Sequence, residues 1–259
     1  KSINLALSVR GWTALDAVGV GDEIRKIGIP MYGRMMHDLQ GNLSYQPYGK
    51  EGQAIYSISR GKTNAVMMDM AEKHGNATIH YNHDCKKVDL SAGIVTLTNT
   101  LTNEEITVKA DLVFGVDGAF SAVRYNSFQK LNRFNYSQNY IADGYREILL
   151  PANPDGTHKL DKNALHIWPR KQYMMIALPN VDGSFTCTLF IAFEGKHAME
   201  NLKTPEAVTA FFKQHFPDAV DMMPELTQDY FANPDASLVM IKCNPWHYEN
   251  KICLMGDAA

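Results

Sequence analysis

The strongest constraint on the fold is an apolar run that ends in an acid and a glycine, within DLVFGVDGAFSAVR at residues 111–124. A short continuous apolar run is typical of a strand covered on both faces of a parallel sheet, although any buried strand can look the same. Gly118 permits a positive φ or a close approach to a ligand, and Asp117 can accept hydrogen bonds. Ser121 can cap a following helix, whose N-terminus favours anions. The segment predicts a turn that faces a bound dinucleotide, with a purely structural Asp-Gly turn as the alternative.

A second segment of the same kind ends the sequence, KICLMGDAA at residues 251–259. Gly256, Ala258 and Ala259 leave room for a bulky group over the backbone, and Asp257 supplies an acceptor. The carboxyl ends of parallel strands are where open α/β folds bind ligands. Two such strand ends, far apart in one chain, favour a shared ligand more strongly than either does alone.

Composition excludes several classes of protein. The 259 residues are 45% hydrophobic and 20% charged, which is enough for one large core or two modest ones. A net charge of −3 with no basic block argues against nucleic acid as a partner. The four cysteines, at positions 85, 187, 243 and 253, form no C-x-x-C pair or zinc-finger spacing, so buried thiols in a reducing compartment are expected, with no metal site. No apolar stretch is long enough to span a membrane as a helix.

Local signals predict an interleaved organisation of the chain. Helices are expected over 10–19, 61–75 and 204–218, with Ser8, Ser59 and Thr204 as caps. Strands are expected at 78–82, 86–90, 93–99, 105–110, 111–118, 144–151, 164–170, 173–180, 184–193, 237–243 and 251–257, with a hairpin over 31–48. We expect an α/β fold in which 1–30, 55–127 and 249–259 form a dinucleotide-binding domain around a mostly parallel sheet. Residues 31–54 and 128–248 would form a second, antiparallel domain.

Together the two acidic strand ends resemble the flavin-dependent aromatic hydroxylases, the single-component FAD monooxygenases. That family carries D-x-x-x-x-x-D-G-x-x-S-x-x-R, present here as Asp111, Asp117, Gly118, Ser121 and Arg124. It also carries a later G-D-A-A-H, present as residues 256–259, with the sequence ending where the His would stand. The resemblance implies a Rossmann-like FAD-binding domain with an interleaved antiparallel-sheet substrate domain. It also implies truncation at both ends, because the family's glycine-rich turn would precede Lys1.

Longer strings extend the resemblance over essentially the whole chain, among them GIPMYGRMMH, QPYG, NALHIWPR and SFTCTLF. They are similar to the family members that act on L-kynurenine. The resemblance then implies hydroxylation at the ring 3-position during tryptophan degradation, with FAD as cofactor and NADPH and O2 consumed. Two alternatives stay open: a related FAD hydroxylase or reductase with another substrate, and a non-catalytic fragment that only binds a ligand or partner. A cytoplasmic location is expected for a bacterial protein, and a membrane-anchored parent protein stays open.

The resemblance also assigns candidate site residues. Arg34 and Tyr48 match residues that hold kynurenine, and a guanidinium fork suits an amino acid carboxylate. The matched cofactor-binding residues are Ala6, Arg60, Cys85, Asp117, Gly118, Gly256 and Asp257. No side chain is expected to act as a nucleophile. Without the resemblance, Arg34 would read as a surface cation and Tyr48 as a packing aromatic. Phe185, Phe190, His166 and Trp168 are expected either to wall the substrate pocket or to pack in the core.

Overall fold

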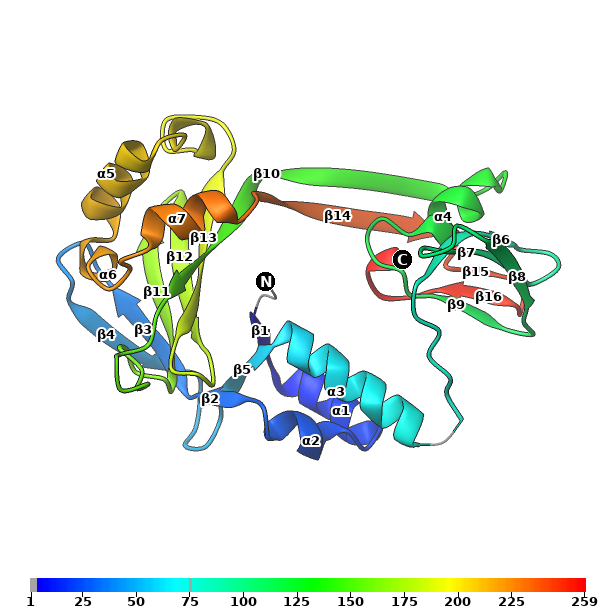
Figure 1. Ribbon diagram of the computed structural model, residues 1–259, viewed down its shortest axis with the longest axis horizontal. Helices are drawn as coiled ribbons and strands as arrows, with labels where there is room; N and C mark the ends of the chain where they lie inside the picture. Colours follow the sequence, from blue (N-terminus) through cyan, green and yellow to red (C-terminus); the bar gives the residue numbers. More distant parts are fainter. Residues whose placement is uncertain (1–3, 75) are drawn as a thin grey trace. The chain divides into compact units, whose positions relative to one another are not determined.

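The computed structural model describes residues 4–74 and 76–259, which belong to two compact units. Unit 1 comprises residues 1–77 and 142–237, and unit 2 comprises 78–141 and 238–259 (Figure 1). The division falls inside strand β10 (Asn135–Leu150) and near the start of β14 (Ala236–Asn244). Unit 1 combines 1–30 and 55–77 with much of the predicted substrate segment. The units are defined by compactness, so the predicted functional division of the chain stays a prediction.

A seven-stranded sheet is the main element of unit 1, and β10 and β14 extend from it into unit 2. Its strand order is β14-β10-β13-β12-β11-β3-β4. The strands not yet defined are β3 (Gly33–His37), β4 (Leu43–Pro47), β11 (Ala164–Arg170), β12 (Tyr173–Pro179) and β13 (Phe185–Ala192). Strands β3 and β4 confirm the predicted hairpin. The pairing of β3 with β11 is parallel, which the sequence analysis did not anticipate.

Three helices cover one face of this sheet, α5 (Pro205–His215), α6 (Pro217–Val220) and α7 (Leu226–Ala232), as Figure 1 shows. The strand expected at 184–193 is present as β13, and alternate residues along it, Phe185, Cys187, Leu189 and Ile191, are fully buried. The cap predicted for α5 is also present, since Thr204 Oγ1 accepts a hydrogen bond from the Ala207 amide at 3.2 Å. The helix-covered face therefore forms the core, and the opposite face is left for other contacts.

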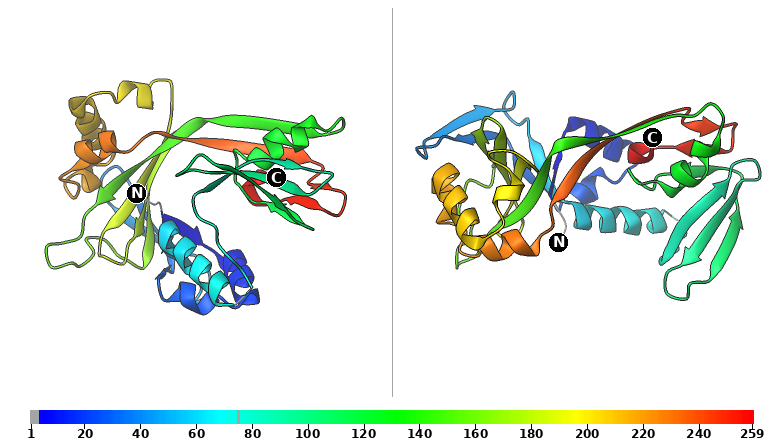
Figure 2. Two further views of the ribbon diagram at one scale, coloured as in Figure 1. Left: turned by 45° about the vertical axis from the view of Figure 1, so that its right-hand side comes forward. Right: turned by 90° about the horizontal axis from the view of Figure 1, so that it is seen from above.

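The N-terminal part of unit 1 differs from expectation. Strands β1 (Asn4–Leu7), β5 (Ile55–Ser59) and β2 (Ile29–Met31) were not expected, and they form an antiparallel sheet where a mostly parallel one was expected. Helices α1 (Val9–Ala17), α2 (Gly21–Arg25) and α3 (Arg60–Lys73) share a hydrophobic cluster with β5, and the left view of Figure 2 shows these blue and cyan helices close together. Ser59 accepts a hydrogen bond from the Lys62 amide as predicted. Ser8 precedes α1 without a capping hydrogen bond from its side chain, so that cap prediction is wrong.

Unit 2 contains two small three-stranded sheets and the short helix α4 (Ala122–Asn126). One sheet is an antiparallel meander of β6 (His83–Asp89), β7 (Ile94–Asn99) and β8 (Glu105–Lys109), where strands were expected at 86–90, 93–99 and 105–110. The other sheet is formed by β15 (His247–Tyr248), β16 (Ile252–Leu254) and β9 (Val113–Gly115). Residues 78–82 do not form the predicted strand. They end at Asn82, whose φ of 59° lies in the left-handed region and interrupts an extended backbone.

Strand β9 is shorter and more exposed than its apolar sequence predicts. Phe114 is 54% exposed and Val116 is 68% exposed, so the prediction of burial on both faces is wrong. The strand lies at the edge of its sheet. Its contact with helix α4 is made by Val123, which packs close to Gly115. The parallel pairing predicted for this strand is present, with β16. Among the described residues, no helix has the length and apolar character needed to cross a membrane.

Candidate cofactor and substrate sites

The two acidic strand ends lie side by side in unit 2. Strands β9 and β16 pair in parallel, with Leu254 opposite Gly115, and the Met255 amide donates to the Gly115 carbonyl at 2.9 Å. The chain therefore leaves both strands at the same edge of the sheet, once into Asp117-Gly118 and once into Gly256-Asp257. Residues about 140 positions apart in sequence thus share one location, as the resemblance of the two segments requires.

A buried arginine ties these two turns together. Arg124, at 2% exposure, donates from Nη1 to the Ala258 carbonyl at 2.8 Å and from Nη2 to the Ala119 carbonyl. Its guanidinium also lies over the ring of Tyr136, 5.1 Å from the centroid. A buried cation is tolerated when it is hydrogen-bonded, and here the acceptors come from both turns. The family motif contains this arginine, and the structure gives it a role that the sequence analysis did not assign.

Asp117 and Ser121 shape the first turn. Asp117 Oδ2 accepts a hydrogen bond from the Val123 amide at 3.1 Å, and Ser121 Oγ accepts one from the Arg124 amide at 2.9 Å. Both therefore satisfy amides in the first turn of α4, which confirms Ser121 as the cap. The structural alternative for Asp117 holds in part, since one carboxylate oxygen serves the fold. Asp117 nevertheless remains exposed, as does Asp257.

The two glycines of these turns provide the space that a ligand needs. Gly118 has φ +80° and Gly256 has φ +61°, and no atom lies within 4 Å of the position that a Cβ would take at either residue. The positive φ values favour glycine, and the open space lets a ligand approach the backbone. Exposed carboxylates flank both positions and can accept hydrogen bonds from ribose or ribityl hydroxyls. The residues present at these two turns therefore fit the binding of a flavin dinucleotide.

Cys85 belongs to the same part of unit 2. It lies on β6 at an irregularity in the pairing with β7 and is half-buried. Burial raises the pKa of its thiol, and the nearby charges of Asp117 and Asp84 raise it further. The thiol is therefore protonated and not a nucleophile near neutral pH. Five of the seven predicted cofactor residues belong to this unit: Cys85, Asp117, Gly118, Gly256 and Asp257.

Arg34 and Tyr48, the predicted substrate residues, meet in unit 1. The Arg34 guanidinium lies over the Tyr48 ring, 5.2 Å from its centroid. Burial raises the pKa of Tyr48, against the lowering effect of the adjacent Arg34 cation. The phenol therefore keeps its proton and can donate a hydrogen bond, while the exposed guanidinium of Arg34 keeps free donors. This pair is equipped to bind a carboxylate.

The sheet face that carries Arg34 is the one opposite the helices. A row of facing residues runs across five strands of this face: Met36, Ile167, Ile176, Thr188 and Glu147. Side chains alternate along a strand, so Arg34 lies on the same face as Met36, and Tyr145 on the same face as Glu147. Phe190 is on this face too, opposite Tyr145, whereas Phe185, His166 and Trp168 are buried on the other face. For those three residues the core-packing interpretation is correct.

A cavity of about 740 Å³ opens at one side of this face. It is lined by residues of α3, including Arg60 and Asn64, and by Tyr145, Glu147 and Asn233. Arg60 is exposed at the first position of α3, which fits either a ligand contact or an ordinary helix-start cation. Ala6 is exposed on β1, where it pairs with Ser57. Ala6 and Arg60 thus belong to unit 1.

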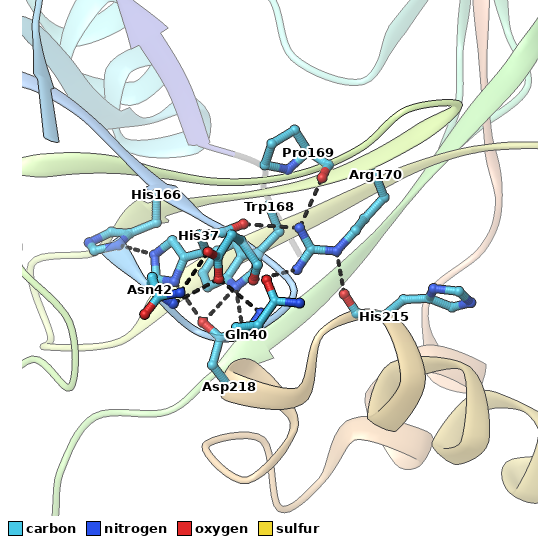
Figure 3. A network of polar contacts seen from close by, with 10 residues as sticks. His37, Gln40, Asn42, His166, Trp168, Pro169, Arg170, His215 and Asp218 are labelled. Carbon is cyan, nitrogen blue, oxygen red and sulfur yellow. Dashed lines mark hydrogen bonds and ion pairs between the residues drawn. The ribbon is translucent and has the colours of Figure 1, made fainter. Parts of the chain in front are cut away.

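Sequence reasoning missed a buried polar network on the helix-covered face (Figure 3). His37 bonds to Asp218 through Nδ1 at 2.6 Å and to His166 through Nε2 at 2.9 Å. Burial lowers the pKa of His166 to about 4. These residues are separated by more than fifty positions along the chain and have no spacing pattern, so only the fold reveals them. Among the residues that the structure describes, no group of His, Cys, Asp and Glu is arranged to hold a metal ion.

Comparisons with solved structures agree on the fold. A tetrameric form of 2-methyl-3-hydroxypyridine-5-carboxylic acid oxygenase superimposes with a TM-score of 0.74 at 19% identity, over 99% of this chain and 64% of that one. The tetracycline destructase Tet(51) superimposes with a TM-score of 0.62 at 16% identity, over 99% and 64% respectively. At these identities the superpositions show the fold alone, and they confirm the expected α/β fold class.

Curated relatives are more similar in sequence. A protein of Flavobacterium johnsoniae named kynurenine 3-monooxygenase is 52% identical over 258 residues, which cover 100% of this chain and 57% of the relative. Proteins of the same name are 47% identical in Dictyostelium discoideum and 43% identical in Sus scrofa, with 55% and 54% of their lengths covered. The chain thus spans little more than half the length of these relatives. A family model described as "FAD binding domain" matches residues 5–259, and the chain belongs to this FAD-binding family.

Proposed function

We propose that the protein to which this chain belongs is an FAD-dependent monooxygenase that hydroxylates L-kynurenine at the ring 3-position. The observation that carries this proposal is identity of 52% over the full length of the chain to a relative named kynurenine 3-monooxygenase. The balanced reaction consumes kynurenine, NADPH, a proton and O2, and yields 3-hydroxykynurenine, NADP⁺ and water. FAD, when bound, supplies the electron transfer from NADPH and the activation of O2.

The proposed cofactor contacts lie at the two turns tied by Arg124. Asp117 and Asp257 would accept hydrogen bonds from sugar and ribityl hydroxyls, and Gly118 and Gly256 would allow the ligand to approach the backbone. Cys85, Arg60 and Ala6 are further proposed contacts. In this interpretation residues 1–30, 55–127 and 249–259 serve the cofactor, and 31–54 and 128–248 serve the substrate.

The proposed substrate contacts follow from the chemistry of Arg34 and Tyr48. Arg34 would donate to the amino acid carboxylate, and the protonated Tyr48 phenol would donate a second hydrogen bond. Apolar side chains on the same sheet face, such as Met36 and Ile176, would exclude water from the aromatic ring of the substrate. Exclusion of water limits the unproductive release of hydrogen peroxide. The sheet face would therefore help to couple NADPH oxidation to hydroxylation of the substrate.

The four cysteines carry free thiols, which supports a reducing compartment such as the cytoplasm.

The test of the function is a reaction of the full-length protein with kynurenine, NADPH and air, with products identified by mass spectrometry. A product heavier by one oxygen atom, with NADPH consumed in equal amount, supports the proposal. NADPH oxidation without that product, or hydroxylation of another aromatic compound only, would replace it with the related-hydroxylase alternative.

A further inference from the structure

The buried network around His37 holds more protons than its residues ordinarily carry. His37 lies on β3, with 2% of its surface exposed, between Asp218 of α6 and His166 of β11 (Figure 3). His166 in turn contacts the Asp161 carbonyl through Nε2 at 2.9 Å. Three hydrogen bonds therefore run in series, from the Asp218 carboxylate through two imidazole rings to a backbone carbonyl.

Counting hydrogens along this series fixes its protonation. The Asp161 carbonyl only accepts, so His166 Nε2 must carry a hydrogen. A neutral His166 then has an unprotonated Nδ1, so His37 Nε2 must donate to it. The remaining bond, between His37 Nδ1 and Asp218 Oδ2, still needs a hydrogen. Two neutral imidazoles supply two hydrogens, and three are required, so the network contains one additional proton.

The surroundings favour this proton on His37 and the negative charge on Asp218. The His37 ring is stacked on the indole of Trp168, with centroids 4.0 Å apart and planes 26° from parallel. An indole face attracts a cation. The Trp168 Nε1–H also donates to Asp218 Oδ2 at 2.9 Å, which stabilises a carboxylate. Burial acts to raise the pKa of Asp218, but the hydrogen bonds from His37 and Trp168 outweigh it and leave that pKa below its usual value.

The charged groups that face His37 come from several elements. Asp218 approaches from α6, and the neutral His166 from β11. Arg170, also on β11, donates to the His37 carbonyl at 2.9 Å and to the Asp38 carbonyl at 3.2 Å, and so is the nearby cation that opposes protonation. The side chain of Asp38 accepts from Asn42 and adds a negative charge in the following turn. The residue opposite His37 on β4 is the apolar Leu43.

The network joins the β3–β4 hairpin to the rest of unit 1 at the end of β3. His37 is three residues from Arg34 on the same strand, and Tyr48 follows β4 directly. We propose that the His37 imidazolium and the Asp218 carboxylate, with His166, form a positioning device that fixes this hairpin and hence the carboxylate-binding pair Arg34 and Tyr48. This role rests on the proposed function, whereas the additional proton rests on the hydrogen-bond geometry alone.

Loss of the proton has a defined consequence. Without the additional proton, one of the three bonds is replaced by two lone pairs that face each other. This attachment at the end of β3 is then weakened, although the pairing of β3 with β11 remains. A substitution that breaks the series should therefore raise KM for kynurenine, while kcat, which depends on the cofactor, changes much less.

Substitution of Asp218 in the full-length enzyme tests the device. In Asp218→Asn the amide can donate to His37 Nδ1 and still accept from Trp168, so all three bonds form without the additional proton. KM should then stay close to the wild-type value. Asp218→Ala leaves His37 Nδ1 and Trp168 Nε1 without acceptors, so KM should rise about tenfold at every pH, with kcat within about twofold. Asp155→Asn, at an exposed carboxylate of a distant turn, is the control for the loss of one charge.

A direct measurement separates this inference from the proposed function. NMR of ¹⁵N-histidine-labelled full-length enzyme, with the His37 signals assigned by comparison with His37→Asn, should show His37 as an imidazolium in the wild type and as a neutral imidazole in Asp218→Asn. A neutral His37 in the wild type would overturn the proton assignment, whether or not kynurenine is a substrate. An unchanged KM in Asp218→Ala, or a rise of the same size in Asp218→Asn, would overturn the positioning role. If the wild-type enzyme does not hydroxylate kynurenine, the proposed function and the positioning role both fail, and the NMR result still decides the proton.

Discussion

At the scale of single residues, the candidate sites depend on a few side chains with specific environments. Tyr48 is a phenol kept protonated by burial beside a guanidinium, and Gly118 and Gly256 have backbone conformations that a side chain would strain. Asp117 combines a capping hydrogen bond with an exposed position beside open space. These details distinguish candidate binding residues from ordinary surface residues of the same type.

Removal of the Arg34 guanidinium should weaken substrate binding selectively. We expect Arg34→Ala in the full-length enzyme to raise KM for kynurenine by about 10- to 100-fold, because a charge-assisted hydrogen-bond pair to the carboxylate is lost. FAD content, read from the visible spectrum, should stay at the wild-type level. Steady-state kinetics provide the measurement, and Arg133→Ala, another exposed arginine, is the matched control. An unchanged KM would remove Arg34 from the binding site.

Neutralising Asp257 should weaken retention of the flavin. Asp257→Asn keeps the size of the side chain but replaces the charged carboxylate with a neutral amide. The amide has one acceptor oxygen in place of two, and that oxygen accepts hydrogen bonds less strongly. We expect about a tenfold increase in the dissociation constant of FAD for this variant. Fluorescence titration of the apoprotein with FAD measures it, with Asp221→Asn as the control for loss of an exposed charge. Equal affinity in the two variants would argue against Asp257 as a contact.

At the scale of secondary-structure elements, the caps make separable contributions to stability. Thr204 accepts a hydrogen bond from the Ala207 amide at the start of α5, whereas Thr209, on the same helix, donates to the Pro205 carbonyl. We expect Thr204→Ala to lower the free energy of unfolding by about 1 kcal/mol, and Thr209→Ala to change it by less than about 0.5 kcal/mol. Urea unfolding of the two variants checks this. Equal losses would show that helix propensity, and not the cap, dominates at this helix.

The elements also show what the sequence could and could not predict. The alternation in β13 and the signals around α3, α5 and α4 are local, so they predicted these elements correctly. The antiparallel pairing of β1, β5 and β2 and the parallel pairing of β3 with β11 depend on long-range partners that periodicity does not encode. The candidate residues came from the resemblance to a family, whereas the three-proton network of His37 required distances. Residues 78–82 were misassigned because an apolar and β-branched composition does not reveal the turn at Asn82.

At the scale of the whole molecule, the chain's stability should depend on pH through His166. Burial lowers the pKa of this residue from 6.5 to about 4, so between these values the unfolded chain binds a proton that the folded chain does not. Stability should therefore decrease as pH falls through this range, by at most about 3 kcal/mol. Thermal unfolding of wild type and His166→Asn between pH 7 and pH 4 measures the effect, since the variant lacks the titrating group. A Tm that falls equally in both proteins would assign the acid sensitivity to other groups.

The connection made by Arg124 has a consequence for biosynthesis. Its two acceptors, the carbonyls of Ala119 and Ala258, are separated by more than half the length of the chain, and β9 pairs with β16 in the same unit. During translation, residues 111–124 leave the ribosome long before residue 258 is made, and a buried guanidinium cannot find its second acceptor until then. A nascent chain arrested before residue 252 should consequently leave Arg124 open to solvent and the Asp117 turn unable to capture a flavin.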